Sequence, residues 1–180
     1  MKNVPHNPLA FLPWLLGAYI ATALLCEWTG ISNQPSALAL LSPISEIIPS
    51  IQSYTVLSPN RDKAVFEISL AWLFSLALPV LMLRAVDWET VNQSAARLGG
   101  MLRAGLFFLA ASGFLLTLMT YPITPSDSRR FSRVIAYFYK SDMAFIWGAG
   151  IAALAGVALL FFAVGIIQLY KFFINQGDSK

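Results

Sequence analysis

The sequence predicts an all-α, polytopic membrane protein with four transmembrane helices in an antiparallel bundle and interfacial helices in the longer loops. Two observations support this class. Of the 180 residues, 57% are hydrophobic and only 12% are charged, whereas a soluble domain carries about 25% charged residues. Four long apolar runs also divide the chain, at residues 9–26, 64–83, 104–121 and 143–170. We therefore expect a single membrane domain over residues 1–180. The composition excludes disorder, nucleic-acid binding and, with one cysteine, a disulfide scaffold.

The first apolar run, residues 9–26, is expected to be a retained span. Trp14 and Trp28 lie near its ends, where interfacial tryptophans are common. A cleaved signal peptide is the alternative, since a lysine precedes the run and Ala21 and Ala23 offer a small-x-small cleavage site. We favour the span because the apolar core of a signal peptide is shorter.

The connector at residues 29–63 contains isoleucines at a one-faced helical spacing: Ile44, Ile47, Ile48 and Ile51. Ser42 and Pro43 suit the N-cap and the first position of a helix, and Pro49 limits that helix to a couple of turns. The pattern predicts a short helix lying in the headgroup region. A loop packed over the bundle is the open alternative.

The second run, residues 64–83, contains one acidic side chain, Glu67. A charge at the centre of a span costs about 2.5–3.5 kcal/mol on insertion scales. Glu67 lies only one turn inside the end of the run and four residues after Lys63, so snorkelling or an ion pair with Lys63 relieves much of that cost. We favour this structural role over a functional carboxylate, and we expect Pro79 to do no more than kink the helix.

The third and fourth runs carry small residues that permit close helix packing. Residues 110–113 make the middle of the third run thin. The fourth run is longer than a bilayer requires, so it tilts or extends beyond the hydrocarbon. In it, Gly148, Ala152 and Gly156 recur at every fourth residue, the small-xxx-small pattern of helix contacts in membranes. We favour packing within the chain over partner docking for this face, and keep both.

The connector before the fourth run predicts a basic amphipathic helix. Apolar side chains fall on one face, at Phe131, Val134, Ile135 and Phe138, and basic side chains on the opposite face, at Arg129, Arg133 and Lys140. Arg130 lies to the side. Membrane lipid is the first expected contact of this helix. An acidic segment of a partner protein is the second.

No constellation for catalysis is present in the sequence. The only histidine, His6, lies in the N-terminal tail, and no second cysteine or histidine is available for a metal site. One acidic residue within the runs is too few for a proton relay, and matched repeats typical of transporters are missing. We therefore expect no enzyme activity, no cofactor, no metal and no small-molecule substrate.

The orientation in the membrane is not decided by charge, because the 12 lysines and arginines divide equally between the two sides. The two longer connectors are more easily accommodated on the outer side, which favours both termini inside.

The whole-chain pattern resembles the immunity proteins of pore-forming colicins, colicin A type. The resemblance covers the length, the four runs, the Pro49-Ser50-Ile51 stretch, the basic connector from Arg129 to Lys140, and the Lys171-Phe172-Phe173 exit. It implies a protein of the bacterial inner membrane with both termini cytoplasmic. Such a protein binds the inserted pore-forming domain of a cognate toxin and blocks its opening.

This resemblance makes the toxin domain and membrane lipids the expected partners. The expected contacts with the toxin are the face of Gly148, Ala152 and Gly156 and the basic residues Arg129, Arg130, Arg133 and Lys140. The alternative function is a small accessory or assembly subunit of a larger membrane complex, in which the same small-residue face packs permanently against a neighbour.

Overall fold

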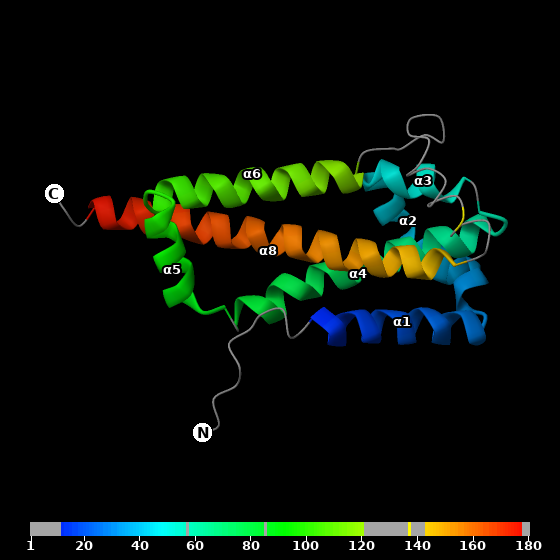
Figure 1. Cartoon of the computed structure of the whole chain (residues 1–180). Helices are drawn as coiled ribbons and strands as arrows, with labels where there is room; N and C mark the ends of the chain where they lie inside the picture. Colours follow the sequence, from blue (N-terminus) through cyan, green and yellow to red (C-terminus); the bar gives the residue numbers. More distant parts are fainter. Residues whose placement is uncertain (1–11, 57, 85, 121–136, 138–142, 178–180) are drawn as a thin grey trace, which may run out of the picture.

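The computed structural model describes residues 12–56, 58–84, 86–120, 137 and 143–177, and every regular element in those ranges is helical. The longer helices are α1 (Leu12–Trp28), α4 (Arg61–Leu83), α6 (Met101–Thr120) and α8 (Ala144–Gly177). The shorter ones are the 3-10 turn η2 (Ile31–Asn33), α2 (Pro35–Ile47), α3 (Pro49–Thr55) and α5 (Trp88–Arg97). Helices α2 and α3 lie at one end of the molecule and α5 at the other (Figure 1).

Three helices are long and apolar enough to cross a membrane, over Arg61–Leu83, Met101–Thr120 and Ala144–Asn175. They coincide with the last three predicted runs. Helix α1 has 17 residues, which at 1.5 Å per residue is about 26 Å, short of the roughly 30 Å hydrocarbon core. The predicted first run begins at residue 9, outside the described residues, so this fourth span stays a prediction.

Helix α8 is the common packing partner of the other long helices. It lies between α4 and α6 (Figure 1) and also contacts α1. Its 34 residues form one continuous helix, about 51 Å long. The prediction that this run exceeds the bilayer core is therefore confirmed.

Glycines let α6 and α8 approach closely. A Cβ atom added at Gly105 would lie 3.2 Å from the carbonyl oxygen of Gly165, and one added at Gly165 would lie 3.1 Å from that of Gly105. Two glycines thus face each other at the crossing, as in close helix pairs of membrane proteins. The sequence analysis missed this pair because the two residues lie on different helices and neither belongs to a repeated small-residue pattern.

The connector between α1 and α4 differs from its prediction. A helix was expected to begin at Pro43, but α2 begins at Pro35 and continues through Pro43. Proline at the first turn suits Pro35 equally well. Pro43 has no N–H to donate to the carbonyl oxygen of Ala39, and the Ser42 hydroxyl donates to that oxygen instead, at 3.1 Å. Ser42 therefore does not cap the helix but compensates for the proline inside it.

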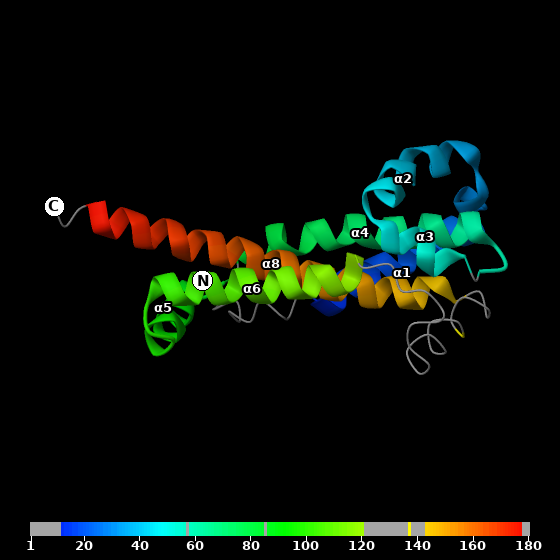
Figure 2. The ribbon, with the colours of Figure 1, turned by 90° about the horizontal axis from the view of Figure 1, so that it is seen from above.

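The isoleucine face is divided between two helices, because α2 ends at Ile47 and Pro49 begins α3. Ile51 is fully buried, and Ile44 and Ile48 pack against the same core cluster. Ile47 is 78% exposed. Both short helices contact α4, and Figure 2 shows α2 standing to one side of the long helices.

Candidate functional site

The small-residue face of α8 packs inside the chain. A Cβ at Gly148 would collide with the hydroxyl of Tyr19 on α1 and lie 3.4 Å from the Cβ of Ala71 on α4. One at Gly156 would lie 2.6 Å from Cδ2 of Leu78 on α4, and Ala152 is fully buried. The intramolecular alternative is thus the one observed. A partner helix could reach this face only by displacing α1 or α4.

The second predicted contact region lies outside the described residues. It comprises Arg129, Arg130, Arg133 and Lys140. Their role stays a prediction.

Charged groups at the start of α4 connect it to α1. The ammonium group of Lys63 is 2.6 Å from Oε1 of Glu27, and Lys63 is only 4% exposed. This interhelical bridge was not predicted. The signal in the sequence is that Glu27 directly follows the first apolar run and Lys63 directly precedes the second. These positions place both charges at the same end of adjacent helices.

Glu67 does not snorkel to the surface, since it is 1% exposed. The Tyr19 hydroxyl donates a hydrogen bond to the backbone carbonyl oxygen of Glu67, at 3.1 Å. This bond joins α1 to α4 beside Gly148. The predicted ion pair between Lys63 and Glu67 stays a prediction, because the bridge that the structure shows for Lys63 is with Glu27.

Helix α6 presents an open small-residue face to its surroundings. Ala110, Gly113 and Thr117 are exposed at helical spacing, and no atom lies within 4 Å of a Cβ added at Gly113. The Thr117 hydroxyl donates to the carbonyl oxygen of Gly113 at 2.7 Å, so its polar group is satisfied within the helix. Leu106 and Phe114 flank the stripe and are also exposed. This face is apolar, thin and uncovered by the described residues.

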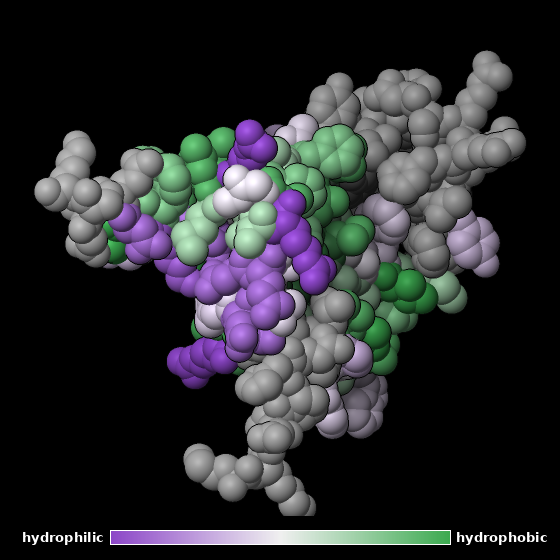
Figure 3. Space-filling view, turned by 60° about the vertical axis from the view of Figure 1, so that its left-hand side comes forward, coloured by the Kyte–Doolittle hydropathy of each residue, from purple (hydrophilic) through white to green (hydrophobic). Residues whose placement is uncertain are grey.

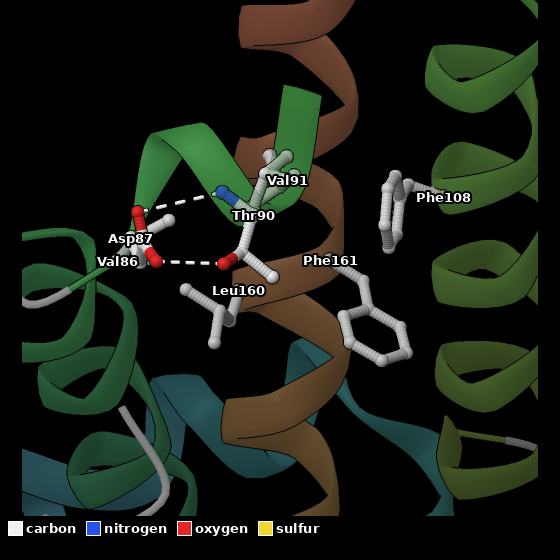
Figure 4. A pocket seen from close by; sticks show the side chains of 8 residues that line it. Val86, Asp87, Thr90, Val91, Phe108, Leu160 and Phe161 are labelled. Atoms are coloured by element: carbon white, nitrogen blue, oxygen red, sulfur yellow. Dashed lines mark hydrogen bonds between the residues drawn. The ribbon is translucent and has the colours of Figure 1, made fainter. Parts of the chain in front are cut away.

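A pocket of about 250 Å³ lies beneath α5, between that helix and the long helices α6 and α8 (Figure 4). Its lining is mostly apolar and comes from α5, the two residues before it, α6 and α8: Val86, Asp87, Thr90, Val91, Phe108, Leu160, Phe161 and Val164. The rings of Phe108 and Phe161 meet edge to face, with centroids 5.6 Å apart.

The two polar residues of the pocket are used in capping α5. Oδ1 of Asp87 accepts the N–H of Glu89 at 3.0 Å and that of Thr90 at 3.4 Å. Oδ2 accepts the Thr90 hydroxyl at 2.6 Å. These bonds satisfy orphan N–H groups of the first helical turn, so the capping aspartate has a structural role.

Helix α5 is fastened to the end of α8 by polar contacts. The amide of Gln168 donates to Oδ1 of Asn92 at 3.3 Å, and Lys171 lies 4.7 Å from the ring centroid of Trp88. Hydrophilic side chains gather on this end of the molecule, over α5 and the adjoining helix ends (Figure 3). They include the exposed Glu89, Gln93, Arg97 and Arg103. The pocket therefore lies directly below a polar surface.

Within the described ranges, no group of three or more His, Cys, Asp or Glu side chains is placed to hold a metal ion. The candidate sites described above are helix faces and the apolar pocket beneath α5. No family model, no curated protein and no solved structure matches this chain.

Proposed function

We propose that this protein is an immunity protein of the bacterial inner membrane, which binds the inserted helices of a cognate pore-forming bacteriocin and blocks pore opening. In this proposal α1, α4, α6 and α8 all cross the membrane as an antiparallel bundle. Both termini and α5 lie on the cytoplasmic side. Helices α2 and α3 lie on the outer side, where the toxin arrives.

The open face of α6 is the observation that carries the proposal. Association of helices in lipid depends on close packing, which small residues permit. On α8, Gly148 and Gly156 are already in contact with α1 and α4. On α6, Ala110, Gly113 and Thr117 are exposed. The α6 stripe is thus a face that a toxin helix can reach without unpacking the bundle.

The proposal is tested by protection of sensitive bacteria. Cells expressing the wild type, Gly113→Leu or Gly150→Leu are challenged with a panel of pore-forming bacteriocins, and potassium efflux is recorded. Gly150 is a matched control, because it is also exposed and no atom lies within 4 Å of an added Cβ. We expect the wild type and Gly150→Leu to protect against one toxin. In cells expressing Gly113→Leu, the level of protection against that toxin is expected to be at least tenfold lower.

The buried stripe on α8 is a poorer target for mutation than Gly113. Leucine at Gly148 or Gly156 would collide with Tyr19 or Leu78, respectively, and would destabilise the fold.

Equal protection by Gly113→Leu and the wild type would remove α6 as the toxin contact. Sensitivity to every toxin, with the protein present in the membrane, would contradict the proposal. A stable large assembly in mild detergent without toxin would support the accessory-subunit function instead.

A further inference from the structure

We propose that the pocket beneath α5 holds one acyl chain of an anionic phospholipid. The first argument is its chemistry. Six of its eight lining residues are apolar, and Asp87 and Thr90 hydrogen-bond to each other and to the first turn of α5. An occupant therefore gains most from apolar contact with the valine, leucine and phenylalanine side chains.

The second argument is the size of the pocket. Its volume of about 250 Å³ is below the roughly 300–1,000 Å³ of sites that enclose drug-sized ligands. A pocket of this volume takes up part of a long apolar chain rather than a whole drug-sized molecule. Phe108 and Phe161 on α6 and α8 form one side and Val91 of α5 another (Figure 4), so an apolar chain beneath α5 would contact both sides.

The third argument is position. The pocket lies under an amphipathic helix near the polar end of the bundle (Figure 3), against residues that lie well inside the apolar lengths of α6 and α8. In a membrane, α5 then lies at the level of the headgroups and the pocket at the upper part of the acyl chains. A phospholipid is the molecule whose apolar part occupies that depth.

The fourth argument is charge. The described charged residues of this end are four cations, Arg84, Arg97, Arg103 and Lys171, and two carboxylates, Asp87 and Glu89. The Asp87 carboxylate already accepts N–H groups at the α5 N-terminus, which offsets its charge further. Arg84 precedes the pocket residue Val86 in the chain, and Lys171 contacts Trp88 beside Asp87. A headgroup with net negative charge is therefore favoured.

The test measures lipid retention by native mass spectrometry of the full chain. The protein is released from detergent after exposure to phosphatidylglycerol, phosphatidylethanolamine or phosphatidylcholine with identical acyl chains. We expect phosphatidylglycerol to be retained at least threefold more than the other two. Val91→Phe fills the pocket from α5 and is expected to reduce retention at least tenfold. Ala96→Phe adds the same ring on the exposed face of α5 and is expected to leave retention within twofold.

A crosslinking experiment on the wild type keeps the proposal testable if Val91→Phe fails to fold. Phosphatidylglycerol with a photoactivatable acyl chain is expected to label Val91, Phe108 and Phe161 above Phe114 and Leu118, which are exposed on the open face of α6. Equal labelling of both regions would mean ordinary contact with the surrounding bilayer and would overturn the proposal. Unchanged retention by a folded Val91→Phe, or equal retention of the three lipids, would overturn it as well.

Discussion

At the scale of single residues, the junction of α1, α4 and α8 depends on one missing side chain. Gly148 leaves the space that the Tyr19 hydroxyl occupies, and from there the hydroxyl donates to the backbone of α4. The Tyr19 ring also meets Phe74 edge to face, with centroids 5.7 Å apart. A single glycine on α8 thus determines how α1 can bond to α4.

Gly148→Ala is therefore expected to destabilise the protein by about 1–3 kcal/mol through overpacking. Tyr19→Phe removes the hydroxyl and one hydrogen bond, at a cost of about 1 kcal/mol. In the double variant the alanine methyl occupies the space of the missing hydroxyl, so the combined cost should fall below the sum by more than about 0.5 kcal/mol. Thermal unfolding in detergent measures the cycle. Simple additivity of the two costs would refute the proposed contact.

At the scale of the elements, α2 contains a proline that the sequence predicts as a helix start. Pro43 stands nine positions into the helix that begins at Pro35, and Ser42 supplies the donor that proline lacks. Long apolar runs were predictable because hydrophobicity alone determines them. The start of α2 was not, because two prolines suited the first turn and only the hydroxyl contact distinguishes them.

The Ser42 hydroxyl is expected to matter only while residue 43 is proline. In the wild type, Ser42→Ala should cost about 1 kcal/mol, because the carbonyl oxygen of Ala39 loses its donor. Pro43→Ala restores a backbone N–H and should stabilise the chain by up to about 3 kcal/mol. In that background Ser42→Ala should cost almost nothing. Chemical unfolding of the four variants provides the measurement, and an equal cost of Ser42→Ala in both backgrounds would contradict this account.

The candidate site was predictable only in part, because sequence patterns identify small residues but not their neighbours. The stripe of Gly148, Ala152 and Gly156 was recognised, yet the same spacing suited a partner or α4. The crossing of Gly105 and Gly165 and the bridge from Lys63 to Glu27 join residues of different helices, which no single run reveals. The pocket beneath α5 likewise requires three helices to be brought together.

At the scale of the whole molecule, the two ends of the helix bundle are formed by different short helices. Helices α2 and α3 form one end, and α5 with the cationic end of α8 forms the other (Figure 1). With the α5 end inside the cell, the cations Arg84, Arg97, Arg103 and Lys171 lie on the side where the positive-inside rule places them. These four belong to the six basic residues of that side in the tied count of the sequence, so the orientation rests on labelling.

Labelling of introduced cysteines tests this orientation. In a background with Cys26 replaced by serine, Ser36→Cys on α2 should react with a membrane-impermeant maleimide in intact cells. Gln93→Cys on α5 should react only after the cells are permeabilised. Both positions are exposed, so accessibility within the protein is matched. The opposite labelling pattern would invert the topology and remove the cytoplasmic placement of α5.

The central position of α8 affects the order in which the helices can pack during synthesis. It contacts α1, α4 and α6 but follows them in the chain, so the ribosome produces those three helices before their shared neighbour exists. Until then α4 carries the buried Glu67 and Lys63 without the surface that completes its packing. Synthesis of α8 is therefore the step that lets the separate helices pack into one folded structure. Substitutions in α8 should therefore be the ones that expose the newly made chain to membrane proteases.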